Sequence, residues 1–167
     1  MIHFILVFLL ILSTSIGVWE MAEINTMITP IPKIIIITEN PIKAVIKNLG
    51  CPKEKLDEIT KAVELASVQT NLNPYLLSVL MFTESGFNFK AESNKGYKGL
   101  MQTPTATKQW ADVDVLHGAR ILQEKLLISK GDIFKALALY KGGENQTAKK
   151  QAREVLVMYK RIVEKKG

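Results

Sequence analysis

Glu84 combines an acidic side chain with a position that alters its proton affinity. It ends a strongly apolar run, Leu76 to Thr83, and Ser85 and Gly86 follow directly. A carboxylate at the end of such a run is partly desolvated, and desolvation disfavours its charged form and raises its pKa. A proton donor working near neutral pH needs that shift. The pattern therefore predicts general acid chemistry, against the alternative of a helix-end glutamate that points into water.

The element that must position this acid is a helix over residues 74–84. Asn73 can cap its start, and Pro74 suits the first turn, where its missing N–H costs no hydrogen bond. Gly86, just past the last turn, can adopt the left-handed conformation that turns the chain away. We therefore expect a cleft beside the acid.

Helical periodicity disappears from Phe87 to Thr103, where Asn and Gly mark turns and a small hairpin could form. Apolar residues at helical spacing predict four further helices. These begin at Cys51-Pro52, at Asp112 or Asp114, at Asp132 and near Thr147. The fold class expected is mainly α, with one irregular or β insert directly after the acid.

Composition limits the other possibilities. The chain has 167 residues and a formal net charge of +6, which allows one domain plus a short appendage and suits an anionic partner. The cationic last helix fits a solvated face, and the sequence shows no groove signature of aromatic and basic residues, so no nucleic acid partner is expected. Cys51 is the single cysteine, and His3 and His117 are the two histidines. This set favours no metal site, and no cofactor is expected.

The N-terminal part divides into two predicted segments. Residues 1–19 are uncharged and strongly apolar, which indicates a signal peptide or a signal anchor; cleavage after Gly17 suits the first alternative. Residues 20–50 form a connector of uncertain structure, in which three prolines, the last being Pro41, would break a helix. Its Ile34–Thr38 run favours a short strand. We expect an exported protein of the periplasm or cell envelope, with its domain over residues 51–167.

Three motifs occur in the order and spacing of one family. They are Glu84-Ser85-Gly86-Phe87, then Ser93 with Lys95-Gly96-Tyr97-Lys98-Gly99-Leu100-Met101-Gln102, then Ala136-Leu137-Ala138-Leu139-Tyr140. Asn73–Leu77 and Gly118–Leu122 add to the match. Over about residues 55–142 the chain thus resembles the soluble-type lytic transglycosylases, relatives of goose-type lysozyme.

The resemblance implies a lysozyme-like helical domain with a groove for peptidoglycan glycan strands. Glu84 matches the sole catalytic acid/base of the family. It would protonate the β-1,4 bridging oxygen between N-acetylmuramic acid and N-acetylglucosamine, and then accept the proton of the muramic C6 hydroxyl as a 1,6-anhydro ring closes. Most glycosidases use two carboxylates, but substrate assistance is a known exception. Glu92 is the other acid nearby, and a solvated turn position suits it better.

The resemblance also implies a set of substrate-binding residues, each with a structural alternative. Ser93 matches a serine whose hydroxyl approaches the acid, or it forms a turn. Gly99 allows close approach of the sugar or a positive φ. Met101 and Gln102 match a groove-lining pair, although a methionine is as well suited to the core. Tyr140 matches a tyrosine whose hydroxyl reaches the acid or the sugar, or it packs in the core.

Three departures from the family pattern leave other functions open. Lys141 stands where the family has asparagine, Tyr97 replaces a small residue, and the segment 102–107 is one residue short. In this shortening the chain resembles the compact family members found in phages and secretion systems, so phage or secretion assembly is one expected context. A membrane anchor through residues 1–19 is a separate expectation. The alternatives to lytic cleavage are a hydrolytic lysozyme of the same fold and a non-catalytic wall-binding or assembly module.

Overall fold

The computed structural model describes residues 39–104 and 110–165. This part of the chain forms six α-helices and one short 3-10 helix, without a strand, which confirms the mainly α prediction. The elements are α2 (Pro41–Asn48), η1 (Lys53–Lys55), α3 (Leu56–Thr70), α4 (Pro74–Ser85), α5 (Ala111–Ile128), α6 (Ile133–Tyr140) and α7 (Gln146–Glu164). The predicted signal segment, the Ile34–Thr38 strand and residues 105–107 of the shortened 102–107 segment lie outside the described residues.

The caps predicted for two helices are confirmed. The Asn73 side chain accepts a hydrogen bond from the Tyr75 amide at the start of α4, and Gly86 ends that helix with φ of 59°. The Asp132 side chain caps α6 through the Lys135 amide. These side chains bond amides that have no partner within the helix, which is why short polar residues define the boundaries.

Two predicted helix starts were wrong in detail. Pro52 precedes the 3-10 turn η1 instead of occupying the first turn of α3. Neither Asp112 nor Asp114 caps α5, because the helix begins at Ala111 and both acids lie in its first turn. A carboxylate there still interacts favourably with the positive end of the helix dipole, so the sequence pattern resembles that of a cap.

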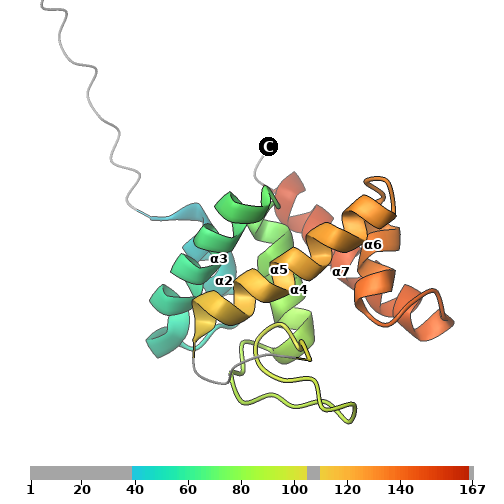
Figure 1. Ribbon diagram of the computed structural model, residues 1–167. Helices are drawn as coiled ribbons and strands as arrows, with labels where there is room; N and C mark the ends of the chain where they lie inside the picture. Colours follow the sequence, from blue (N-terminus) through green and yellow to red (C-terminus); the bar gives the residue numbers. More distant parts are fainter. Residues whose placement is uncertain (1–38, 105–109, 166–167) are drawn as a thin grey trace, which may run out of the picture. The chain divides into compact units, whose positions relative to one another are not determined.

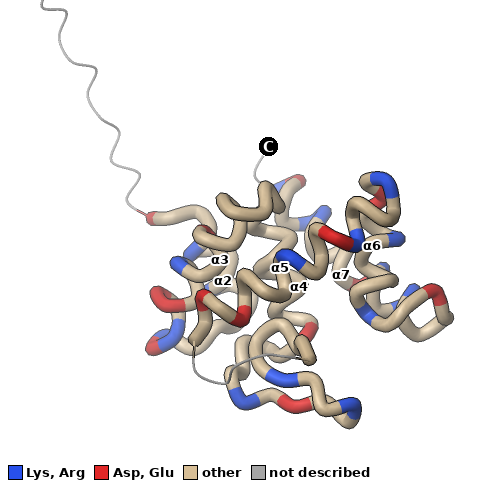
Figure 2. The backbone as a smooth tube through the Cα atoms, viewed as in Figure 1, with Lys and Arg blue, Asp and Glu red and all other residues tan. Residues whose placement is uncertain are grey.

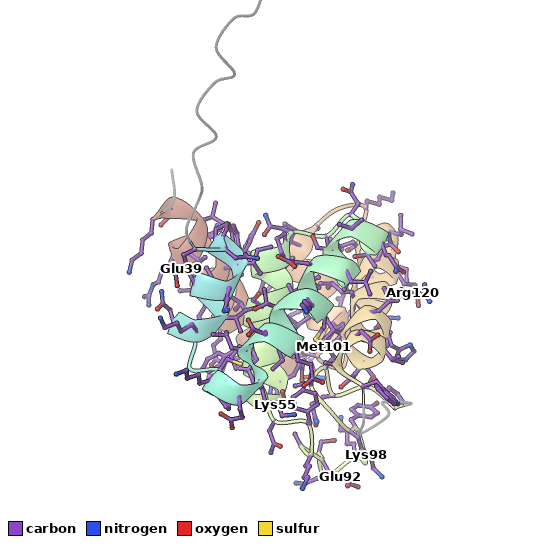
Figure 3. The ribbon with its side chains drawn as sticks, turned by 90° about the vertical axis from the view of Figure 1, so that its left-hand side faces the viewer. Glu39, Lys55, Glu92, Lys98, Met101 and Arg120 are labelled. Carbon is purple, nitrogen blue, oxygen red and sulfur yellow. The ribbon has the colours of Figure 1, made fainter. Side chains whose placement is uncertain are left out.

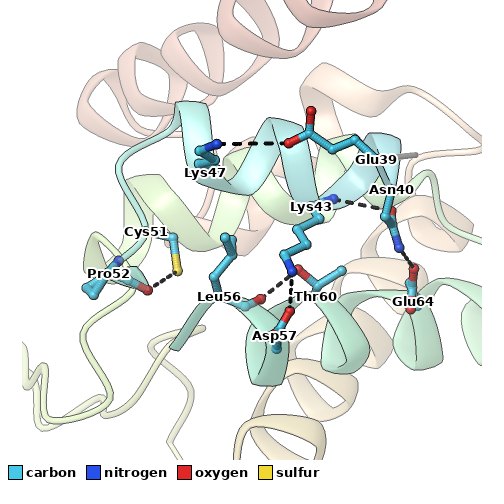
Figure 4. Close-up of polar contacts among 10 residues, drawn as sticks. All are labelled: Glu39, Asn40, Lys43, Lys47, Cys51, Pro52, Leu56, Asp57, Thr60 and Glu64. Atoms are coloured by element: carbon cyan, nitrogen blue, oxygen red, sulfur yellow. Dashed lines mark hydrogen bonds and ion pairs between the residues drawn. The ribbon is translucent and has the colours of Figure 1, made fainter. Parts of the chain in front are cut away.

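Helix α2 forms within the predicted connector, so the expectation that Pro41 would break a helix was wrong. Pro41 occupies the first turn, where its missing N–H costs no hydrogen bond, and Asn40 caps the helix. Figure 4 shows how α2 is joined to α3: Asn40 donates to Glu64 at 2.6 Å, and Lys43 pairs with Asp57.

Helix α4 is the central element of the core. Six consecutive side chains from Leu76 to Met81 are buried, and α4 contacts α2, α3 and α7 (Figure 1). A helix that is buried on all sides needs apolar residues around its whole circumference. Its buried position carries the end of the helix, and with it Glu84, into the interior.

The insert between α4 and α5 is fixed to the helices by its apolar end. Lys98 forms isolated antiparallel bridges with Glu92 and Thr103, and Glu92 and Lys98 lie at the outer tip of the insert (Figure 3). Met101 is fully buried, and a Cβ added to Gly118 of α5 would lie 2.5 Å from the Met101 Cβ. The glycine thus allows the insert to pack directly on the α5 backbone.

Candidate active site

Glu84 lies at the end of α4 in an ion pair with Lys141. The Glu84 Oε1 and Lys141 Nζ atoms are 2.9 Å apart, and the side chains are 13% and 6% exposed. Burial raises the pKa of Glu84, while the charge and the hydrogen bond of Lys141 act in the opposite direction and only partly offset it. The carboxyl group therefore binds its proton more tightly than a free glutamate does.

Lys141 joins the end of α6 to the end of α4, the helix that carries Glu84. It follows α6 directly, and its amide donates to the Leu137 carbonyl oxygen. Its ammonium donates to Thr83 Oγ1 at 3.2 Å as well as to Glu84. The sequence marked Lys141 as a departure from the family pattern but gave no sign of this pairing, because α6 and α4 meet only through tertiary packing.

Tyr140 connects the site to the insert. Its hydroxyl donates to the Met101 carbonyl oxygen at 2.8 Å. Burial raises the pKa of Tyr140, and the negative charges of Glu84 and Asp114 raise it further. The charge of Glu84 thus acts on the Tyr140 hydroxyl, while the hydrogen bond of that hydroxyl goes to the insert.

The polar residues predicted to bind substrate shape the insert itself. Ser93 Oγ accepts from the Tyr97 amide at 3.0 Å, which is a turn contact. Gly99 has φ of 78°. The Gln102 Nε2 atom donates to the carbonyl oxygens of Ala91 and Gly99 at 3.1 and 3.0 Å. Gly99 and Gln102 are thus brought together within one loop, where Gln102 itself adopts a positive φ.

Met101 has its side chain in the core. It is fully buried, so in this structure the side chain packs against α5 and offers no surface to a ligand. Its backbone carbonyl, in contrast, is the acceptor for Tyr140. The Met101 side chain therefore occupies a core position, the alternative to groove lining that the sequence left open.

Asp114 is a positioning group that sequence reasoning missed. Its side chain is buried, and its Oδ2 accepts from the Leu100 amide at 2.5 Å. Burial raises the pKa of Asp114, and hydrogen bonds from the backbone of Leu100 and Met101 act against that rise. An acid one turn before Gly118 on the inward face of α5 was the available signal.

Within the described ranges 39–104 and 110–165, no group of His, Cys, Asp or Glu side chains could hold a metal ion. In the same ranges, no helix has the length and apolar character needed to cross a membrane.

The described residues form a mainly helical domain, consistent with a lysozyme-like domain, and its central helix ends at a buried carboxyl. Residues 61–156 match the family model of the transglycosylase SLT domain, and the chain belongs to that family. It is also 36% identical over 94 residues to a protein named transglycosylase from Enterobacteria phage PRD1. That match covers 52% of this chain and 35% of the phage protein, so it spans about a third of that relative's length. The predicted family resemblance is thereby confirmed.

Proposed function

We propose that this protein is a peptidoglycan lytic transglycosylase in which Glu84 is the single acid/base. The observation that carries the proposal is the burial of the Glu84 carboxyl at the end of α4, which raises its pKa. Membership of the transglycosylase SLT domain family supports the reaction class and a glycan substrate of the cell wall.

The proposed reaction uses the same proton site twice. Protonated Glu84 donates to the oxygen that bridges N-acetylmuramic acid and N-acetylglucosamine as the bond to C1 breaks. The resulting carboxylate then takes the proton from the muramic C6 hydroxyl as that oxygen bonds to C1, so Glu84 ends protonated. Lys141 stabilises the carboxylate that exists between the two transfers, because its ammonium is already in contact with Oε1.

A single-carboxylate mechanism agrees with the positions of the neighbouring acids. Asp114 is buried and bonded to the Leu100 amide. Glu92 lies in the insert and pairs with Lys98 at 3.5 Å. Retaining and inverting glycosidases need two carboxyl groups that face the same bond. With these two acids engaged elsewhere, we assign stabilisation of the reacting sugar to the N-acetyl group of the substrate.

The product mass tests this proposal against hydrolysis by the same fold. Purified protein is incubated with peptidoglycan sacculi, and the soluble muropeptides are analysed by mass spectrometry. We expect anhydro-muropeptides. Products heavier by one water, with a reducing end, would show that the enzyme is a lysozyme instead.

The ion pair also favours a second candidate, a wall-binding or assembly module without turnover. A carboxylate that stays paired with Lys141 remains ionised and cannot donate a proton. In that case the protein would sediment with sacculi, and no soluble muropeptide would appear. Both candidate functions are compatible with export to the periplasm or envelope through residues 1–19, with or without a membrane anchor. Both are also compatible with a role in a phage or a secretion system.

A further inference from the structure

A cavity of about 660 Å³, widely open to solvent, lies between the end of α4 and helix α7. Phe82 and Thr83 line it from α4, and α7 contributes the remaining lining. Those residues are Lys150, Arg153, Glu154, Val157 and Met158. Its volume is within the range of sites that hold small ligands.

The cavity begins directly beside the proposed acid. Thr83 lines it and precedes Glu84 in α4. The same Thr83 hydroxyl accepts the hydrogen bond from Lys141, whose ammonium pairs with Glu84. The Thr83 side chain that lines the cavity and the Glu84 carboxylate therefore contact the same cation, Lys141.

The charges of the cavity favour an anion. Lys150 and Arg153 are both exposed, and neither has an ion pair with a carboxylate in the described part of the chain. Glu154 is the one acid of the lining. Arginine presents a planar fork that matches a carboxylate. Lys and Arg recur along α7 in Figure 2.

The remaining lining is apolar. Val157 is 41% exposed and Met158 is partly buried, while Phe82 packs on the Phe87 ring with centroids 5.9 Å apart. A lining that combines apolar side chains with two cations suits a ligand that carries both carboxylates and small apolar groups, and it suits a plain sugar less well.

We propose that this cavity is a subsite for a carboxylate-bearing substituent of the glycan strand whose sugar bridge lies at Glu84. The inference rests on the proposed function and adds to it a preference for acidic over neutral substrate. In peptidoglycan the carboxylates belong to the stem peptide, or to the lactyl group where the peptide has been removed. Both sources share the chemistry that Lys150 and Arg153 would bind.

The test compares the double variant Lys150→Gln/Arg153→Gln with the wild type on two substrates, native sacculi and sacculi whose carboxylates are capped as amides. The matched control is Lys160→Gln/Arg161→Gln, which removes two exposed cations of α7 that do not line the cavity. We expect the cavity variant to lose about tenfold in kcat/KM on native sacculi, as two exposed charge contacts would give. The control should keep the wild-type value. On capped sacculi the wild type should fall to the level of the cavity variant.

Glycan stripped of its peptides identifies the source of the carboxylate. Wild-type rates equal to those on native sacculi would show that the freed lactyl carboxylate binds as well as a stem-peptide carboxylate, and rates equal to those on capped sacculi would assign the subsite to the stem peptide alone. The inference is overturned if the cavity variant matches the control, or if capping leaves the wild-type rate unchanged.

A binding measurement separates this inference from the proposed function. If the wild type releases no muropeptide from any substrate, the proposed activity fails, and cosedimentation with native and capped sacculi then tests the cavity. Retention that falls on capping and in the cavity variant alone would support the subsite. Equal retention throughout would reject it.

Discussion

The Lys141 ammonium lies 2.9 Å from the Glu84 carboxylate, with both side chains almost fully buried. The pair joins the end of central helix α4 to the residue that follows α6. Two opposing effects act on the pKa of the Glu84 carboxyl. Burial raises the pKa of Glu84, and Lys141 lowers it by a smaller amount. In the proposed mechanism this balance sets the pH range in which the acid is loaded.

Lys141→Met should move the alkaline limb of kcat/KM to higher pH. A general acid works only while protonated, so activity falls as pH rises through the pKa of Glu84 in the free enzyme. Removing the ammonium removes the influence that lowers this pKa, while burial continues to raise it. The measurement is kcat/KM for muropeptide release as a function of pH. Lys141→Arg retains the charge and serves as the control. A limb that stays in place, or that moves to lower pH, would contradict the assignment.

Tyr140→Phe should reduce the stability of the domain strongly and the catalytic rate only slightly. The substitution leaves the Met101 carbonyl without the donor that lies 2.8 Å away, which costs about 1–3 kcal/mol for a buried acceptor. Thermal unfolding should show a lower Tm, and kcat well below that temperature should fall less than about tenfold. Tyr159→Phe, at a partly buried position of α7, is the matched control. An unchanged Tm with a large loss of kcat would instead place the hydroxyl in the reaction.

Gly118→Ala should destabilise the contact between α5 and the insert. The new Cβ would lie 2.5 Å from the Met101 Cβ and 2.8 Å from its Cγ, closer than atoms can pack. Overpacking of this kind costs about 1–3 kcal/mol, which exceeds the gain of up to about 1 kcal/mol from alanine in a helix. Thermal unfolding would show a lower Tm, whereas an equal or higher Tm would contradict this packing.

Local signals in the sequence predicted the helix that carries the acid. Asn73 and Pro74 mark the start of α4, and Gly86 ends it with a positive φ, because caps and turns depend on residues a few positions apart. The desolvation of Glu84 followed from the apolar run before it. The helix boundaries and the desolvation of Glu84 both depend on residues close together in the sequence, so both could be predicted from it.

Tertiary contacts set what the sequence could not predict. In the sequence Lys141 is only a departure from the family asparagine, yet in the structure it pairs with Glu84. Asp114 looked like a cap, but its carboxylate is buried and holds the Leu100 amide of the insert. A charged side chain is assigned to the surface by default, and only the packing of α5 and α6 shows these two to be interior. Met101 was similarly ambiguous until its contact with Gly118 placed it in the core.

Glu84→Gln tests the central claim most directly. The amide keeps the size of the side chain but cannot donate and recover the proton, so muropeptide release from sacculi should fall by about 10²–10⁴-fold. The variant must remain folded, which circular dichroism under the assay conditions verifies. Release of anhydro-muropeptides by the wild type and almost none by the folded variant is the predicted result. A folded variant that releases them at the wild-type rate would contradict the assignment of Glu84 as the acid/base.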